Sequence, residues 1–258
     1  MRALISNDDG VHSPGLAALE RAARAAGFET WVVAPDREQS ASSHALTMHR
    51  PLRVRAVSDR TWTVDGTPTD CVNLALCSIL KASPPDLVLS GINTGPNLGD
   101  DVTYSGTVAC AFEGTLLGVP SIAFSLDTWQ DRGRGEPDFA LAEAAARAVI
   151  SLAVEHPPAG DTLWNVNIPP GPPKGFRVTR MGRRRYGENI VEKIDPRGRP
   201  YFWIGGVHVD THADGTDLTA VADGWVSITP LHLDLTDYRA LSDLETLARL
   251  LPLPGAER

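Results

Sequence analysis

The sequence contains little cysteine, and its few cysteines follow no recognisable pattern. Only Cys71, Cys77 and Cys110 occur in 258 residues. An odd number without the paired spacing of zinc ligands argues against a disulfide framework and against a structural zinc site. We therefore expect buried free thiols in a reducing compartment, and we predict a cytoplasmic protein.

Long hydrophobic runs are also missing. No apolar run approaches the roughly 18 residues that a membrane-spanning helix needs. The N-terminus enters an apolar strand directly, without the charged and apolar regions of a signal peptide. We expect a soluble protein with no membrane partner.

Three common active-site motifs are absent. There is no G-x-G-x-x-G after the first predicted strand, no G-x-x-x-x-G-K-[ST] and no G-x-S-x-G. These absences argue against a dinucleotide-binding fold and a P-loop NTPase, and they weaken the hypothesis that the protein is a serine esterase. The net charge of −8 argues against nonspecific binding to nucleic acid polymers. A bound cation could still attract an anionic substrate.

What the sequence does contain is an alternation of apolar strands and amphipathic helices up to residue 175. This alternation predicts an α/β fold with a mostly parallel, doubly wound sheet. The 42% hydrophobic fraction is enough for a full core. The expected strands are Ala3–Ile5, Glu29–Ala34, Leu52–Ala56, Thr61–Val64, Asp86–Ser90, Val119–Ser125 and Thr162–Ile168; the expected helices are Pro14–Ala26, Pro68–Lys81, Thr107–Leu117 and Asp138–Glu155.

After Gly175 the pattern changes. Phe176–Met181 and Tyr186–Gly205 are typical of strands, with a turn near Pro196, and they predict a β-arm too thin to bury its own core. Trp225–Leu231 predicts a returning strand, and Asp237–Leu251 a closing amphipathic helix. We expect residues 1–175 to form the catalytic core. Residues 176–258 should belong to the same domain, with the arm packing on another subunit or over a site.

Asp8 and Asp9 stand where the first strand ends and the first helix is about to begin. In open α/β sheets this carboxyl edge is where ligands bind. Adjacent carboxylates repel each other unless a cation or a proton lies between them, which favours a divalent-metal site with oxygen ligands. A solvated Asn-Asp-Gly turn is an equally good interpretation of these residues alone.

Asn93 and Asn97 lie in a glycine-rich segment, Gly91–Gly106, after another predicted strand. Glycine lets the backbone approach a ligand, and asparagine offers an acceptor for a metal and donors for an anion. Turn formation explains the same residues. Their density favours a ligand-binding loop.

The next predicted helix begins at Thr107, directly after Ser105 and Gly106. Free backbone N–H groups and the helix dipole at such a position favour a phosphate, and the hydroxyls can add hydrogen bonds. Ordinary capping by serine or threonine is the common alternative. A cation site on the same edge of the sheet would favour phosphate binding.

A serine-rich loop, Pro35–Thr47, begins at the same sheet edge and offers two further candidates. Ser40 could supply an oxygen to a cation, although most loop serines have no such role. His44 could bind an anion or act as an acid, or could be incidental. The run Arg183–Arg185 is better explained as a solvated arm face or a subunit contact than as a phosphate clamp.

Several motifs together resemble the SurE (survival protein E) family of nucleotidases, and the resemblance covers nearly the whole chain in order. The motifs are NDDG at residues 7–10, AP and SA between residues 34 and 41, GTPTDC at residues 66–71, and SGINTGPNLGDD with SGTV between residues 90 and 108. The late segment WVSITPL and the arm with its arginine run are also similar to that family.

This resemblance implies a divalent-metal-dependent phosphomonoesterase that acts on nucleoside 5′- and 3′-monophosphates, and in some members on short polyphosphate. It also implies a Rossmann-like three-layer α/β/α core. The oligomer would be a homodimer or homotetramer held by swapped C-terminal elements. By the same resemblance one Mg²⁺ or Mn²⁺ per subunit would be held by Asp8, Asp9, Ser40 and Asn93. Asn97 and Ser105–Gly106–Thr107 match positions around the phosphate.

The mechanistic hypothesis is hydrolysis at the divalent cation, with Asp8 and Asp9 catalytic, and with His44 as a candidate substrate-binding residue or leaving-group acid. Two rival hypotheses use the same loops. One is a nucleotide-sensing module that binds metal and nucleotide without turnover. The other is a metal-dependent glycosyl or nucleotidyl transferase, which would need an acceptor and would release little free phosphate.

Overall fold

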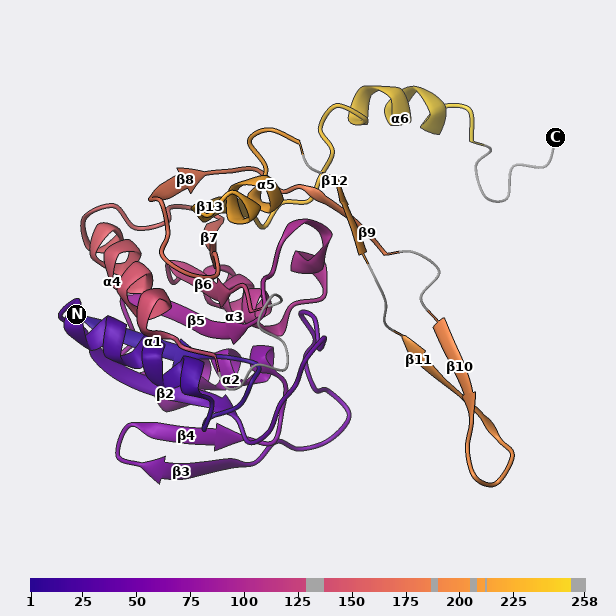
Figure 1. The fold of residues 1–258 in the computed structure, drawn as a ribbon. Helices are drawn as coiled ribbons and strands as arrows, with labels where there is room; N and C mark the ends of the chain where they lie inside the picture. Colours follow the sequence, from indigo (N-terminus) through magenta and orange to yellow (C-terminus); the bar gives the residue numbers. More distant parts are fainter. Residues whose placement is uncertain (129–136, 187–189, 205–207, 212, 252–258) are drawn as a thin grey trace.

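A nine-stranded sheet forms the centre of the molecule in the part of the chain that the computed structural model describes, residues 1–128, 137–186, 190–204, 208–211 and 213–251 (Figure 1). Its strands, in order across the sheet, are β3 (Val54–Ser58), β4 (Thr61–Val64), β2 (Glu29–Pro35), β1 (Arg2–Ser6), β5 (Leu87–Thr94), β6 (Ser121–Leu126), β7 (Thr162–Ile168), β13 (Val226–His232) and β8 (Phe176–Val178).

The sheet is mostly parallel, as predicted. Strands β4, β2, β1, β5, β6 and β7 all run in one direction. Strand β3 is antiparallel to β4, and β13 is antiparallel to β7, while β8 runs parallel to β13. The carboxyl ends of the six parallel strands therefore meet at one edge of the sheet.

Helices cover both faces of the sheet. Helices α1 (Pro14–Ala25) and α4 (Ala140–Glu155) pack together on one face, and α2 (Pro68–Leu74) and α3 (Gly106–Leu116) on the other (Figure 1). Because side chains alternate along a strand, Ala3 and Ile5 join the core under α1 and α4, whereas Leu4 joins the core under α2. The three-layer α/β/α prediction is confirmed.

Several predicted boundaries differ from the structure; the strand predicted at Leu52–Ala56 is Val54–Ser58, and the helix predicted at Asp237–Leu251 is Leu241–Ala248. Two further differences concern longer segments. The helix predicted to reach Lys81 is α-helical only to Leu74 and continues as the π-helix η1 (Ala75–Ile79). Strand β5 extends through Gly91 to Thr94, because Asn93 and Thr94 still pair with β6 after a register shift. The glycines predicted a loop at this point, and the parallel pairing overrides that local preference.

The segment after Gly175 is divided between the sheet and projecting elements. Strand β8, predicted as the start of the arm, instead pairs with β13 at the edge of the main sheet. Helix α5 (Asp217–Ala222), which the sequence analysis did not predict, packs against β13. Its six residues are too few for a helical hydrophobic period to be visible.

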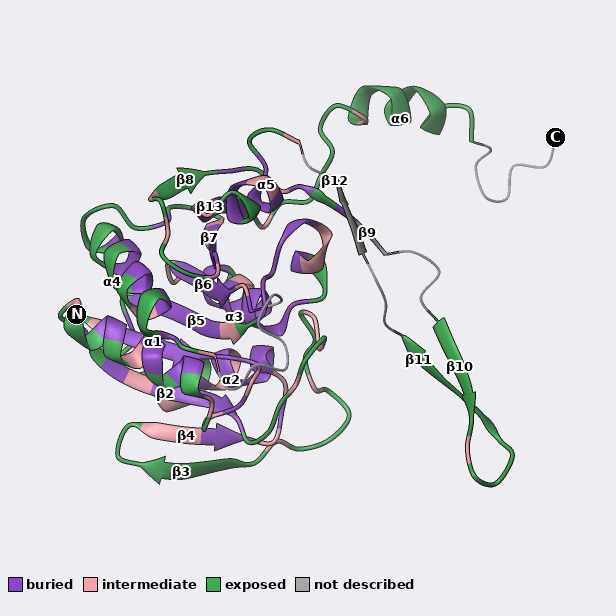
Figure 2. Ribbon diagram, in the orientation of Figure 1, coloured by how far each residue is buried: buried purple, intermediate pink, exposed green. Residues whose placement is uncertain are grey.

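The arm consists of two antiparallel strand pairs. Strand β9 (Arg183–Tyr186) pairs with β12 (His208–Thr211), and β10 (Ile190–Ile194) pairs with β11 (Pro200–Ile204). The β10–β11 hairpin and helix α6 (Leu241–Ala248) project from the body, and their described residues are exposed (Figures 1 and 2). The predicted arm strand also covers residues 187–189 and Gly205, which lie outside the described residues.

A fully buried carboxylate ties the arm to the glycine-rich segment. Asp217 accepts hydrogen bonds from the backbone N–H groups of Gly99 at 2.8 Å, Gly182 at 2.7 Å and Leu218 at 2.8 Å. Gly99 begins the 3₁₀ helix η2 (Gly99–Thr103), and Gly182 directly precedes β9. One side chain thus joins three segments that are distant in sequence.

We expect Asp217→Ala to lower the free energy of unfolding by about 2–4 kcal/mol, because buried N–H groups would lose a charged acceptor. For a chain of this size that corresponds to a fall in Tm of about 5–15 °C, measurable by calorimetry. Asp223→Ala, which removes an exposed carboxylate just after the same helix, should change Tm by less than about 2 °C. Equal Tm values for the two variants would contradict the role assigned to Asp217.

Candidate functional site

The turn after β1 is fixed by its own side chains. Asn7 accepts a hydrogen bond from the N–H of Gly10 at 3.2 Å, and its amide donates to the Gly10 carbonyl at 3.0 Å and to the Ser13 hydroxyl at 3.2 Å. Ser13 in turn caps α1. Gly10 has a φ of +95°, which side-chain-bearing residues rarely adopt. Asp8 and Asp9 are therefore presented from a rigid turn at the carboxyl edge of the sheet.

Asp8 is buried against the start of α3. The Thr107 hydroxyl donates to Asp8 Oδ1 at 2.5 Å. A Cβ atom on Gly106 would lie 2.8 Å from Asp8 Cβ and 3.0 Å from Asp8 Oδ2, so only glycine allows the helix to approach this closely. The positive end of the helix dipole thus faces a carboxylate, which is a stabilising arrangement.

Asp9 lies closer to solvent than Asp8. The Thr94 N–H donates to Asp9 Oδ2 at 3.3 Å. Burial, together with the neighbouring Asp8 carboxylate, raises the pKa of Asp9 to about 7. Burial also raises the pKa of Asp8, against the lowering effect of the hydrogen bond from Thr107. The pair therefore needs a proton or a cation near neutral pH.

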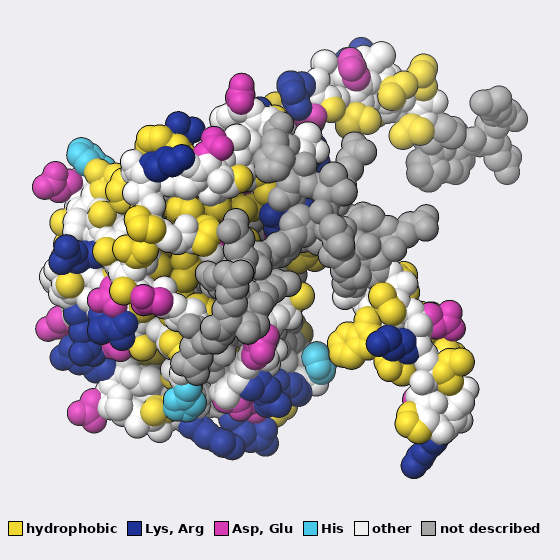
Figure 3. Space-filling view, viewed as in Figure 1, with side chains coloured by type: hydrophobic (Ala, Val, Ile, Leu, Met, Phe, Trp, Pro, Cys, Tyr) yellow, Lys and Arg dark blue, Asp and Glu magenta, His cyan; other side chains and the backbone are white. Residues whose placement is uncertain are grey.

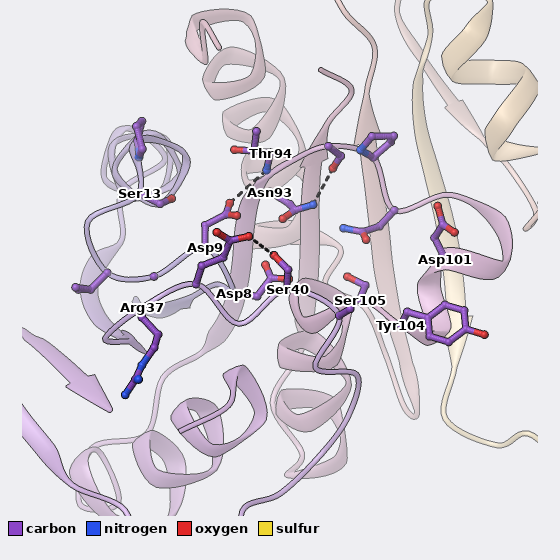
Figure 4. A pocket seen from close by; sticks show the side chains of 18 of the residues that line it. Asp8, Asp9, Ser13, Arg37, Ser40, Asn93, Thr94, Asp101, Tyr104 and Ser105 are labelled. Carbon is purple, nitrogen blue, oxygen red and sulfur yellow. Dashed lines mark hydrogen bonds between the residues drawn. The ribbon is translucent and has the colours of Figure 1, made fainter. Parts of the chain in front are cut away.

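Neutral oxygen atoms complete the surroundings of the two acids (Figure 4). The Asn93 amide nitrogen donates to the Gly95 carbonyl at 2.8 Å, which orients its Oδ1 oxygen. The Ser40 hydroxyl donates to Glu38 at 2.6 Å and keeps its lone pairs. The loop that carries Ser40 is anchored by the Gln39 N–H, which donates to the Asp8 carbonyl at 2.8 Å.

These donors fit a hard divalent cation such as Mg²⁺ or Mn²⁺ and do not fit zinc, because every available ligand atom is an oxygen. Among the described residues, no group of three or more His, Cys, Asp and Glu side chains is placed to hold a metal ion. A cation at Asp8 and Asp9 would therefore also use the amide of Asn93, the hydroxyl of Ser40, and water.

The paired acids open onto a cleft of about 1280 Å³. Asp8, Asp9, Ser40, Asn93, Asn97 and Ser105 all line it. The structure thus brings together the four residues predicted as metal ligands with two of those predicted to bind substrate. Gly106 and Thr107 lie directly behind Asp8, where they contact that carboxylate.

Ser105 has the capping role that the sequence analysis gave as the alternative. Its hydroxyl accepts a hydrogen bond from the Val108 N–H at 3.0 Å and caps α3. This cap fixes the first turn of α3 at the wall of the cleft. A role in phosphate binding remains a prediction.

Asn97 is braced by two asparagines that the sequence analysis missed. Its N–H donates to Asn167 Oδ1 at 2.8 Å, and its carbonyl accepts from the amides of Asn165 at 2.9 Å and Asn167 at 3.0 Å. Its own amide donates to Ser125 at 2.8 Å. The sequence did hold a signal for them, because Asn165 and Asn167 alternate with apolar residues at the fully buried end of β7.

His44 is placed away from the paired acids. It lines a second cavity of about 730 Å³, together with Phe112 and Met181 among others, and the described lining of the main cleft does not include it. Its Nε2 lies 2.8 Å from Glu113 Oε2, and the Asn73 amide donates to Glu113 Oε1 at 2.7 Å. Burial would raise the pKa of Glu113, but these two partners outweigh it and lower the pKa. The contact between His44 and Glu113 anchors the Pro35–Thr47 loop, and a role of His44 in substrate binding or as leaving-group acid remains a prediction.

The arginine run lies at the root of the arm. Arg184 is buried, and its guanidinium pairs with Asp101 at 2.5 Å, while its N–H donates to Asp100 at 2.9 Å. Arg183 reaches Asp100 at 3.4 Å. Arg184 therefore joins β9 to η2, the helix whose Asp101 lines the cleft.

Comparisons with known proteins agree on one family. The family model described as "Survival protein SurE" matches residues 3–188. The 5′-nucleotidase SurE of Anaeromyxobacter dehalogenans (strain 2CP-C) is 51% identical over 262 residues, covering 100% of this chain and 98% of that protein. The 5′-nucleotidase SurE of Myxococcus xanthus (strain DK1622) is 53% identical over 247 residues, covering 94% of this chain and 92% of that protein.

The structural comparison gives the same result. The crystal structure of the SurE protein from Aquifex aeolicus has a TM-score of 0.83 and 43% sequence identity, covering 96% of this chain and 100% of that chain. In the described residues of the present chain, no helix combines the length and the hydrophobicity needed to cross a membrane.

If Asp8 and Asp9 form a cation site, Mg²⁺ or Mn²⁺ at about 100 times its Kd should stabilise the fold by about 2.7 kcal/mol and raise Tm by roughly 5–10 °C. Asp9→Asn should abolish this response. In EDTA the same variant should be more stable than the wild type at pH 8. The pKa of Asp9 is about 7 in the folded protein and about 4 in the unfolded chain, so the folded state loses stability as the pH rises between these two values. An amide at this position does not ionise and therefore avoids that loss.

Scanning calorimetry with EDTA, Mg²⁺ or Mn²⁺ makes the measurement. Asp36→Asn is a matched control, because Asp36 also lines the cleft but follows a different strand and pairs with Arg37. A full cation response in Asp9→Asn would rule out the proposed ligand set.

Proposed function

The chain belongs to the SurE family, and from that premise we propose that it is a divalent-metal-dependent phosphomonoesterase that converts nucleoside 5′-monophosphates to nucleoside and phosphate. Relatives of about half-identical sequence carry the name 5′-nucleotidase SurE. The observation that carries the proposal is the placement of the Asp8–Asp9 pair beside the N-terminus of α3 in one cleft. This arrangement combines a site for a cation with a site for a dianion.

Asp8, Asp9, Ser40 and Asn93 would hold one Mg²⁺ or Mn²⁺ per subunit. When bound, such a cation neutralises charge on the phosphoryl oxygens and lowers the pKa of a coordinated water. The two acids have different roles in this proposal. Asp8 is a fixed ligand because it is buried and bonded to Thr107. Asp9, which is more accessible, would orient the attacking water and accept its proton.

The N-terminus of α3 and the Asn97 loop would receive the phosphoryl group. The dipole of α3 would stabilise the negative charge that increases on the equatorial oxygens during transfer. The water oxygen forms a bond to phosphorus, the ester P–O bond breaks, and the ribose oxygen leaves and takes up a proton. The bracing of Asn97 by Asn165 and Asn167 keeps this part of the cleft rigid.

We extend the proposal to nucleoside 3′-monophosphates and to short polyphosphate, because these substrates also present a terminal phosphoryl group to the same cradle. The cleft volume of about 1280 Å³ accommodates a nucleotide with its hydration. We expect no nucleic acid polymer as a substrate, since the chain carries a net charge of −8. We also propose that the protein works in the cytoplasm.

We expect wild-type protein to release phosphate from nucleoside monophosphates. EDTA should abolish this phosphate release, and added Mg²⁺ or Mn²⁺ should restore it. Asp9→Asn should lose at least about 100-fold in kcat, because it removes both a charge and a proton acceptor at the reacting centre. Asp223→Asn should keep wild-type kcat, since its exposed carboxylate follows α5.

Three outcomes distinguish this proposal from its rivals. Nucleotide binding without phosphate release would favour the nucleotide-sensing module. Consumption of nucleotide only with an added acceptor would favour the transferase. Release that is unaffected by EDTA would contradict the metal dependence and leave the paired acids without their proposed role.

We also propose that the chain assembles as a homodimer or homotetramer through its C-terminal elements. Hydrophobic side chains gather on the β10–β11 hairpin and on α6 (Figure 3). In α6, Leu244 and Leu247 are more than half exposed, although the helix is amphipathic. An isolated hairpin and an unpartnered eight-residue helix are both marginal in water, so partner surfaces would stabilise them.

The double variant Leu244→Asp and Leu247→Asp should reduce the molar mass in solution, because two charges would have to be buried in the interface. Light scattering after size exclusion makes the measurement. Leu152→Asp is the matched control, since Leu152 is an exposed leucine on α4 in the body of the molecule. An unchanged mass in the double variant would exclude α6 from the interface.

A further inference from the structure

One aromatic side chain that lines the cleft is largely exposed to solvent. Among the described residues that line the cleft, Tyr104 is the one phenylalanine, tyrosine or tryptophan. Tyr104 is 60% exposed, although a tyrosine ring normally stabilises a fold by being buried. An exposed aromatic ring beside polar ligand groups is typical of a surface that a ligand covers.

The backbone that carries this ring is held from both sides. The Tyr104 N–H donates to the Asp101 carbonyl at 3.0 Å, and the Tyr104 carbonyl accepts from the Ser43 N–H at 3.1 Å. Tyr104 ends η2, and the next residue, Ser105, caps α3. The ring is therefore mounted on a rigid segment directly beside the proposed phosphate cradle (Figure 4).

Two isoleucines add apolar surface to the same cleft. Ile190 and Ile204 are register partners at the root of the β10–β11 hairpin. They are 66% and 92% exposed, and both line the cleft. We call Tyr104, Ile190 and Ile204 the apolar wall. The cleft thus offers charged and polar groups from the sheet edge, and apolar surface from η2 and the arm.

We propose that the apolar wall binds the nucleobase, and that Tyr104 is the residue on which the base stacks. This inference rests on the proposed function, because a phosphate at the N-terminus of α3 places the rest of the substrate near the residue preceding Ser105. Tyr104 and Ser105 both line the cleft, so the Tyr104 ring lies within reach of a nucleoside anchored by its phosphate. Stacking accepts every base, since each has a π-face, and the larger purines gain more contact.

The wall would allow a cleft with few base-reading groups to prefer nucleotides over other phosphomonoesters. Binding energy from a part of the substrate remote from the phosphorus discriminates between substrates that share a reacting group. The sugar phosphate that lacks a base, ribose 5-phosphate, is therefore the informative comparison with adenosine 5′-monophosphate.

The experiment compares both substrates in wild type, Tyr104→Ala and Tyr104→Phe at a fixed Mn²⁺ concentration. Tyr104→Ala should raise KM for adenosine 5′-monophosphate about tenfold, the usual size of one stacking contact. The change for ribose 5-phosphate should stay within about twofold. Tyr104→Phe should behave like wild type, since it keeps the ring and removes only the hydroxyl.

Adenosine, which carries the base and has no phosphate to lose, gives a readout independent of turnover. Isothermal titration should show adenosine binding to wild type and Tyr104→Phe, weakened about tenfold in Tyr104→Ala. Ile204→Ser should weaken adenosine binding in the same direction and by less.

Other outcomes would overturn the proposal or separate it from the proposed function. Equal losses on both substrates would show that Tyr104 only supports the loop. Unchanged parameters for adenosine 5′-monophosphate, combined with a lower oligomer mass, would make Tyr104 a subunit contact. Tyr104-dependent adenosine binding without hydrolysis of either substrate would support the base site while contradicting the esterase.

Discussion

Repulsion between two neighbouring carboxylates is the constraint on which the cleft depends. Asp8 and Asp9 follow a buried strand, and both are partly removed from water, so the ionised pair is unfavourable by itself. The chain compensates locally through the Thr107 hydroxyl, the Thr94 N–H and the dipole of α3. The remaining imbalance favours a proton or a cation at the pair, and in the proposed function the phosphate that accompanies the cation would bind at the same helix.

The rest of the fold keeps these groups in place. Loops that carry ligand groups are usually the most mobile part of an α/β protein, yet here each is fastened to a buried polar side chain of a neighbouring strand or helix. Asn97 is held by the buried amides of Asn165 and Asn167, and η2 by the buried carboxylate of Asp217. The Ser40 loop is held at its far end by His44 on Glu113. Buried polar side chains thus provide the rigidity that a loop backbone lacks.

Much of this could be predicted from local sequence. The strands and helices up to Ile168 show clear hydrophobic periods, with glycine or proline at their ends, and the motifs at the carboxyl edge of the sheet identify candidate ligands. The parallel topology then brings Asp8, Asp9, Ser40 and Asn93 into one cleft.

Other features depend on contacts between distant residues and have no local signal. Glu113 is 69 residues from His44 in the sequence, and the contact between the two side chains could not be read from either segment alone. Strand β8 has three residues and α5 has six, too few for a period, and their positions are decided by pairing with β13 and by Asp217. The role of Tyr104 follows from its exposure at the cleft, which no local pattern records.

The junction formed by Asp217 and Arg184 has a consequence for how assembly and catalysis are connected. The root of the arm and η2 share these two side chains, and η2 leads directly into the segment that caps α3. Any partner that orders the arm therefore also restricts the segment that forms the cleft. If subunits assemble through the arm as proposed, a nucleotide that binds more tightly to the assembly would strengthen the assembly by the same factor. In an assembly of this kind, nucleotide affinity would depend on protein concentration, and dilution would weaken nucleotide binding.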